Sequence, residues 1–405
     1  WSSDVCSSDL SMLGSGIIVG LSATIVVWQE GLGLDTTQVG LLSGILTFAI
    51  AFGSLFGGRL ADKIGRVLFF NWINLFYAIG AAICVFAPNF TVLLIGLIIA
   101  GLASGADLPV SMTIVSHDAP DEATAAQLVS TTQVFWQVGV FISFICAFLV
   151  SAMQGATGGR VVFAILAVFA VIAWLWRLLS PTFRRFHEAA DVRDAARPAV
   201  VGNGKVSVTK VLFGADKKVL LTYFLAIVIF YVGWNLLANT WGQFQTYMFS
   251  KAGAAQSLAT GLGIILNFVT LVLNIVFASI AGGKYRNKAF FAGIVISLIA
   301  MAAMAMGGAN LWVIVGATAF MNLGSPLAGE ALYKVWTQES FPIEIRASIQ
   351  GFINGFSRLC CGLFALITPA LVLPETIQTT MWCFFGIVII EGIRSEEHTY
   401  ELQSH

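Results

Sequence analysis

The stretch GGRLADKIGR, residues 57–66, lies between two long apolar runs and combines glycines with four charged side chains. Gly57 and Gly58 allow neighbouring helices to approach closely, and Gly65 permits a tight turn into the following helix. The Asp62 carboxylate can face the N-terminus of a neighbouring helix or pair with Arg66. The pattern predicts a short charged connection between two membrane-spanning helices.

The composition extends this prediction to the whole chain. Of its 405 residues, 58% are hydrophobic and 10% are charged, against about 25% charged in ordinary soluble domains. Apolar runs of roughly 20 residues are typical of membrane-spanning helices. Twelve such runs lie near residues 11–29, 38–60, 67–87, 91–115, 127–150, 161–179, 219–247, 257–281, 289–306, 311–337, 346–372 and 377–393. We therefore expect an all-α integral membrane protein.

The two ends of the chain differ from the rest. The run WSSDVCSSDL lacks the basic start and apolar stretch of a signal peptide and has no helical periodicity, so neither a signal peptide nor a helix is expected there. Written as codons, this run and RSEEHTYELQSH are close to reverse complements, as in translated sequencing adaptor. We expect residues 1–10 and 394–405 to be adaptor-derived, and the first and last spans to be truncated.

Basic side chains concentrate in alternate short loops. They lie at Arg59, Lys63, Arg66, Lys284, Arg286 and Lys288, and residues 181–218 hold eight basic against four acidic residues. The other loops carry only Arg160 and Lys251. Because Lys and Arg are retained on the cytoplasmic side, the pattern predicts a multi-pass protein of the cell (inner) membrane with both termini in the cytoplasm.

The polar stretch 181–218 separates six apolar runs from six. GGRLADKIGR at Gly57 has a degenerate counterpart, GGKYRNK, at Gly282, and HDAP ending at Pro120 is matched by ESFP ending at Pro342. Repeats at a fixed offset indicate an internal duplication. We expect two six-helix bundles, 11–180 and 219–393, joined by a cytoplasmic linker. Paired bundles with a substrate site between them are typical of secondary transporters.

Three of these stretches resemble motifs of a known family. GGRLADKIGR closely resembles the loop signature of the major facilitator superfamily. QESFPIEIRAS, residues 338–348, resembles a motif of its sugar porter branch, and PVSMTIVSHDAP, residues 109–120, resembles the partner motif with His117 in place of Glu. The resemblance covers nearly the whole chain. It implies a sugar porter or metabolite:proton symporter in which two pseudo-symmetric six-helix bundles alternate access.

The resemblance also implies a substrate site. Gln133 of QVFWQVG, Asn235 of FYVGWN and Asn267 would contact a sugar. Residue chemistry agrees, because buried amides need partners and amides beside aromatic rings suit hydroxyl-rich ligands. Helix–helix hydrogen bonding or simple packing is the alternative. The candidate substrate-binding residues are Gln133, Trp136, Gln137, Trp234, Asn235, Asn239, Asn267, Glu330 and Arg358.

Four ionisable side chains are expected at membrane depth: Asp107, Glu330, Lys334 and Arg358. Because each charge there costs roughly 2.5 to 3.5 kcal/mol, they should face a cavity or one another. Glu330 and Lys334 are one helical turn apart and can form a structural pair. Arg358 can compensate Glu330 or Asp107, or bind a substrate carboxylate. Sugar acids and other metabolites are therefore kept as alternative substrates to neutral sugars and polyols such as inositol.

Two further roles are assigned to charged residues. Asp107, and after it Glu330, are the candidates for proton coupling, because a carboxyl group in a low-dielectric surrounding can load and release a proton as a cavity changes sides. The first span, SMLGSGIIVG, lacks the Asp that proton-moving sugar porters carry there. Charges that latch the bundles at the cytoplasmic side are expected at Asp62, Arg66, Glu339 and Arg346.

Rival functions are less well supported. His117 and His187, the histidines outside the two ends, have no metal-ligand or triad partner at recognisable spacing, so no enzyme, cofactor or metal site is expected. No repeated filter or charged ring indicates a channel. The expected partners are a small polar solute, a proton and the lipid bilayer, without nucleic acid or a protein partner. A proton-driven exporter or antiporter, a facilitative uniporter and a non-transporting nutrient sensor stay open.

Overall fold

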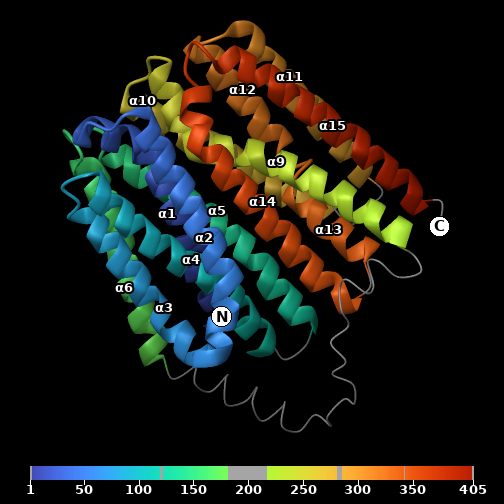
Figure 1. The fold of residues 1–405 in the computed structure, drawn as a ribbon, viewed down its shortest axis with the longest axis horizontal. Helices are drawn as coiled ribbons and strands as arrows, with labels where there is room; N and C mark the ends of the chain where they lie inside the picture. Colours follow the sequence, from blue (N-terminus) through green and yellow to red (C-terminus); the bar gives the residue numbers. More distant parts are fainter. Residues whose placement is uncertain (1, 119–121, 181–216, 281–284, 342, 404–405) are drawn as a thin grey trace. The chain divides into compact units, whose positions relative to one another are not determined.

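The computed structural model describes residues 2–118, 122–180, 217–280, 285–341 and 343–403 (Figure 1). All regular secondary structure in these ranges is α-helical. The chain divides into two units, residues 1–203 and 204–405. This division falls inside the stretch 181–218 that the sequence assigns to a linker.

The first unit contains six described helices. They are α1 (Ser2–Leu32), α2 (Thr36–Ile64), α3 (Arg66–Val85), α4 (Phe90–Asp118), α5 (Glu122–Leu149) and α6 (Thr157–Leu179). The most extensive packing joins α2 to α4, α1 to α5, and α3 to both α4 and α6. Helix α4 therefore lies between α2 and α3, and α3 connects it to α6.

The second unit contains seven described helices. They are α9 (Lys217–Lys251), α10 (Gln256–Ile280), α11 (Arg286–Gly307), α12 (Leu311–Gly324), α13 (Glu330–Ser340), α14 (Ile343–Leu371) and α15 (Ile377–Gln403). Helix α9 packs on α14 and α15, and α11 packs on α12 and α15. Helix α9 therefore lies against two other long helices of this unit.

The tenth apolar run is broken, which the sequence analysis did not predict. Residues 325–329 separate α12 from α13, and Gly329 has the non-helical angles φ −136° and ψ −146°. Pro326 lacks a backbone N–H and disfavours an uninterrupted helix. The apolar content summed over residues 311–337 did not show this break, because such a sum does not register a local interruption. Counted as one span, α12 and α13 bring the described segments to the predicted twelve.

The helices have the composition of membrane spans. In the described ranges, nine helices are long and apolar enough to cross a bilayer, and three shorter apolar segments lie at Phe135–Leu149, Leu311–Gly324 and Ile377–Gly392. Large apolar side chains are exposed on both units, among them Phe76, Ile172, Ile265 and Leu363. Such surface is costly in water and favourable in lipid. The predicted all-α membrane fold is confirmed.

Glycines set the contact between α2 and α4. A Cβ atom on Gly57 would lie 2.5 Å from the Cβ of Ala106, and one on Gly105 would overlap the backbone carbonyl of Ile50. Between α2 and α3, Gly65 has φ +108°, a conformation that favours glycine. The close contact predicted for Gly57 and the turn predicted for Gly65 are both confirmed.

The ends of the chain correct one expectation. Helix α1 begins at Ser2 and α15 ends at Gln403, so the prediction that the first ten residues form no helix is wrong. Nucleating a helix is costly, whereas extending an existing one adds a hydrogen bond for each residue ordered. Periodicity reports which face is buried and does not detect this propagation.

Candidate functional site

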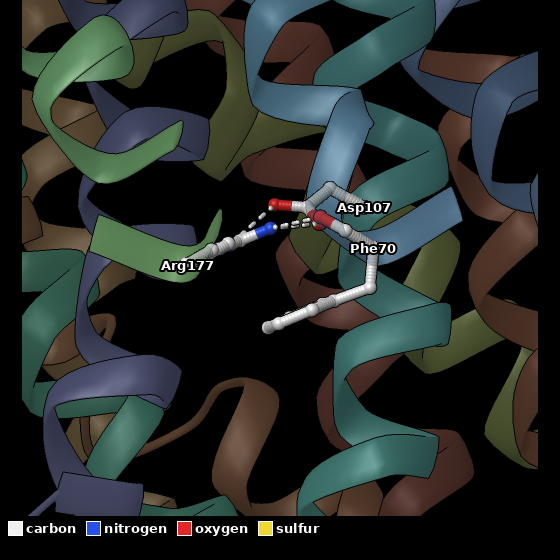
Figure 2. A network of polar contacts seen from close by, with 3 residues as sticks. All are labelled: Phe70, Asp107 and Arg177. Carbon is white, nitrogen blue, oxygen red and sulfur yellow. Dashed lines mark hydrogen bonds and ion pairs between the residues drawn. The ribbon is translucent and has the colours of Figure 1, made fainter. Parts of the chain in front are cut away.

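A buried ion pair joins α4 to α6 in the first unit. Asp107 is 5% exposed and Arg177 is 2% exposed. Arg177 donates from Nη1 to Asp107 Oδ1 at 3.0 Å and from Nη2 to Oδ2 at 3.1 Å (Figure 2). This two-point geometry fixes the orientation of both side chains and gives each charge a direct partner.

Helix α3 completes the surroundings of Arg177. The Nη1 atom also donates to the backbone carbonyl of Phe70 at 3.0 Å, and the Arg177 Cζ atom lies 4.0 Å from the centroid of the Phe70 ring (Figure 2). The ring face attracts the cation. Groups on α3 and α4 therefore compensate the Arg177 charge of α6, which would be costly at membrane depth.

The sequence analysis missed Arg177 and Glu391 among the charges at depth. Glu391 of α15 is 3% exposed. The partner observed for Asp107 is Arg177, where the sequence offered Arg358. A signal for Arg177 was present, because two leucines follow it before the polar linker begins. It was passed over because a basic residue near a span end is ordinarily an interfacial anchor.

In the second unit, α9 and α14 bring predicted substrate residues together. Asn235 of α9 donates from Nδ2 to Ser357 Oγ at 2.8 Å, and the next residue on α14, Arg358, donates from Nε to Asn354 Oδ1 at 3.2 Å. Asn235 and Arg358 are half-buried. An amide, a hydroxyl group and a guanidinium group thus gather on two facing helices.

Trp234 lies at the break between α12 and α13. Its Nε1 donates to Ser325 Oγ at 3.2 Å, and a Cβ on Gly329 would lie 2.8 Å from its indole ring. Tyr231 stacks on Trp234 with ring centroids 5.9 Å apart and on Tyr333 at 3.9 Å. Because Gly329 has no side chain, the indole can sit against the break.

Glu330, Asn239 and Asn267, three further predicted substrate residues, do not share one set of contacts. Glu330 is half-buried and begins α13, directly after the break. The Asn239 Oδ1 accepts from Gln243 Nε2 at 2.8 Å. The Asn267 amide donates to the Gly263 carbonyl of its own helix, α10, at 2.9 Å. Asn267 is therefore bonded within α10 and is not joined to the α9–α14 cluster by any described bond.

Trp136 of the first unit and Trp241 of the second have different surroundings. Trp136 is half-buried on α5 against Gly14 of α1, where a Cβ would lie 3.4 Å from its ring, and Gln137 beside it is also half-buried. Trp241 is 3% exposed and donates to Thr318 Oγ1 at 3.3 Å. Trp241 therefore packs inside the second unit.

Several predicted residues have side chains outside the described ones. They are Gln133, Lys334 and all four members of the predicted gate, Asp62, Arg66, Glu339 and Arg346. Their roles stay predictions. Among the side chains that the structure does describe, no group of three or more His, Cys, Asp or Glu residues could hold a metal ion.

Comparison with known proteins assigns the chain to a family. The sequence model of the Major Facilitator Superfamily matches residues 9–365. The chain belongs to the Major Facilitator Superfamily. This superfamily member is a membrane transporter and not an enzyme, as the sequence predicted.

Relatives and solved structures agree with this membership. The chain is 30% identical to the minor myo-inositol transporter IolF of Bacillus subtilis, over 93% of the chain and 85% of that protein. It is 24% identical to a putative metabolite transport protein of Haemophilus influenzae, over 93% and 89%. A crystal structure of the D-xylose-proton symporter matches with TM-score 0.78 at 14% identity, covering 96% of this chain and 95% of that one. The structural likeness shows the fold.

The two units of this facilitator carry different chemistry. The first buries a compensated carboxylate, whereas the second gathers amide, hydroxyl, indole and guanidinium groups around α9. Amides and hydroxyl groups can each donate and accept, so they match the hydroxyl groups of a polar solute. Indole N–H groups add donors with an apolar ring face.

Proposed function

We propose that this transporter imports a sugar, a polyol such as myo-inositol or a related small polar metabolite, together with a proton. The observation that carries the substrate class is the 30% identity with a myo-inositol transporter over 93% of the chain. A probable polyol transporter of Arabidopsis thaliana is 28% identical over 145 residues, which supports a hydroxyl-rich solute. The D-xylose-proton symporter fold is compatible with proton coupling.

The proposed substrate contacts are the polar and aromatic groups of the predicted set. Asn235 and Ser357 support this role, because each can exchange its hydrogen bond of 2.8 Å for one to a solute hydroxyl group. The full proposed set is Gln133, Trp136, Gln137, Trp234, Asn235, Asn239, Asn267, Glu330 and Arg358. Arg358 would favour a solute that also offers a strong acceptor.

Transport would follow alternating access in the cytoplasmic (inner) membrane with both termini inside. Asp62, Arg66, Glu339 and Arg346 are proposed to latch the cytoplasmic side. Individual exposed ion pairs are weak, so several are required for a gate. The basic loops, which include Lys63, support this orientation.

Asp107 is the proposed proton carrier, with Glu330 as the second candidate. The bidentate contact with Arg177 means that a proton reaching Asp107 would weaken its attraction to the guanidinium group. Proton binding would therefore be coupled to the separation of α4 from α6. This coupling gives a physical route from protonation to helix movement.

The substrate class is tested by counterflow in proteoliposomes. Purified protein is reconstituted with unlabelled myo-inositol inside, and entry of labelled myo-inositol is measured beside labelled xylose and a sugar acid. We expect myo-inositol or another neutral polyol to accumulate, and external acid to stimulate uptake. No accumulation of any of these solutes would contradict the proposal, and proton release on adding solute would indicate an exporter.

Asp107→Asn tests the proton role. The variant keeps an acceptor for Arg177 but cannot titrate, so we expect it to abolish acid-stimulated uptake and to keep counterflow. Glu391→Gln, which changes another buried carboxyl group, is the matched control and should keep the acid stimulation. Acid stimulation that persists in Asp107→Asn would remove Asp107 from the coupling mechanism.

A further inference from the structure

A line of polar side chains continues along α9 beyond Asn235. Asn239, Gln243, Thr246 and Ser250 are four, three and four residues apart. This spacing places them on one face of a helix; we call them the α9 stripe. Trp241 lies on another face, where it contacts Thr318 and Phe384 inside the second unit.

Thr246 has an unusual hydrogen-bond state for a buried helical threonine. Its side chain is 0% exposed, and its Oγ1 atom has no hydrogen-bond partner among the described residues. Thr240, Thr260, Thr318, Thr337 and Thr368 each donate to the carbonyl four residues earlier. The buried Ser250 Oγ atom likewise has no partner in the described structure. Buried hydroxyl groups without a hydrogen-bond partner require an explanation, such as a role in binding a solute.

Open space adjoins the stripe. Gly242 lies three residues after Asn239 and four before Thr246, and it is exposed. A Cβ atom placed there would meet no atom within 4 Å. Gly105, in contrast, has no room for a Cβ against Ile50. Gly242 therefore leaves room on the same side of α9 as Thr246 without serving a close helix contact.

We propose that the α9 stripe is a second solute subsite, which adjoins the Asn235 cluster at Asn239 and binds a neutral polyol as it moves along α9. The inference rests on the proposed function for the class of solute. The stripe contains only amide and hydroxyl groups, which pair with solute hydroxyl groups as donors and acceptors. The nearby Lys251 places its Nζ atom 5.1 Å from the Tyr247 ring centroid. The stripe's own side chains therefore offer hydrogen bonds and no charge to a solute.

Transport kinetics test the two features of the stripe separately. Thr246→Val keeps the shape but removes the hydroxyl group, so the apparent KM for myo-inositol should rise about three- to tenfold with little change in maximal rate. Gly242→Leu fills the open space and should lower the maximal rate at least tenfold while folded yield is kept. Thr240→Val is the matched control, because Thr240 is equally buried but bonds its own helix, and it should change neither value.

Cysteine accessibility tests the stripe independently of transport. Cys84, Cys146, Cys360, Cys361 and Cys383, together with Cys6, are first replaced by serine or alanine. Gly242→Cys and Thr240→Cys are then treated with a charged methanethiosulfonate reagent, with and without myo-inositol. Because position 242 is exposed beside open space and Thr240 is buried, we expect rapid modification at 242, slowed at least threefold by myo-inositol, and negligible modification at 240.

Each outcome bears on a defined claim. Modification at position 242 no faster than at 240 would overturn the subsite, because the space beside the stripe would not be solvated. Rapid modification that no transported polyol slows would also overturn it, since the stripe would then hold only water. A wild-type protein that takes up none of the probes would contradict the proposed function, and reactivity at position 242 would still decide whether the space beside the stripe is solvated.

Discussion

Arg177 places a full positive charge inside α6, and its contacts explain why the fold tolerates it. Two hydrogen bonds to Asp107, one to the Phe70 carbonyl and the Phe70 ring face surround the guanidinium group. Burying two charges is costly, and their mutual attraction repays this only when the geometry is good. Removing one partner should therefore harm stability more than removing both.

Substitutions at the pair test this reasoning at the residue scale. Arg177→Gln or Asp107→Ala alone should lower the free energy of unfolding by about 3–5 kcal/mol, because each leaves an uncompensated buried charge. The double variant should lose less than the sum of the two. Thermal unfolding in detergent measures all three.

Arg160→Gln is the control for that measurement. Arg160 is half-buried, and its Nη2 donates to the Ala87 carbonyl at 2.9 Å. Loss of this charged hydrogen bond should cost about 1.5–3 kcal/mol. Additive losses in the Asp107 and Arg177 variants would show that the pair contributes no coupling energy.

At the scale of elements, glycines decide which helices touch. Helices α2 and α4 approach until Gly105 faces the Ile50 carbonyl and Gly57 faces Ala106. Close backbone contact is a main source of helix association in lipid, because apolar side chains gain little by exchanging lipid contacts for contacts with another helix. On α12, a methyl group added at Gly316 would meet no atom within 4 Å.

The same substitution at two glycines should therefore have opposite effects. Gly105→Ala forces α2 and α4 apart and should cost about 1–3 kcal/mol. Gly316→Ala meets no neighbour and should gain up to about 1 kcal/mol from helix propensity. Melting temperature and the monodisperse yield after size-exclusion chromatography measure both. Equal tolerance of alanine at the two positions would contradict the close α2–α4 contact.

At the scale of the whole molecule, charge asymmetry between loops predicts how the chain lies in the membrane. Lys63 precedes the turn between α2 and α3, and Gln154 lies between α5 and α6; both side chains are exposed. The proposed orientation puts Lys63 in the cytoplasm and Gln154 outside.

Labelling of single cysteines measures this orientation. In a background without other cysteines, Gln154→Cys should react with a membrane-impermeant maleimide in intact cells. Lys63→Cys should react only after permeabilisation. Reaction of Lys63→Cys in intact cells, with Gln154→Cys protected, would reverse the proposed topology.

Much of this protein could be predicted from its sequence because membrane helices satisfy their own backbone hydrogen bonds, so span length and apolar content suffice to locate them. The same local logic identified the close contact of Gly57, the turn at Gly65 and the buried charge of Asp107, whereas Asn235 was singled out by family resemblance. What followed from family resemblance was the superfamily, and the comparison with known proteins confirmed it.

Only the tertiary structure decided the partners of those residues. The pairing of Asp107 with Arg177 and the seating of Trp234 on Gly329 depend on contacts between helices distant in sequence. A side chain's hydropathy gives its depth in the membrane, but depth does not specify which neighbouring helix faces it. That choice is made by packing and charge compensation in three dimensions, which no linear pattern contains.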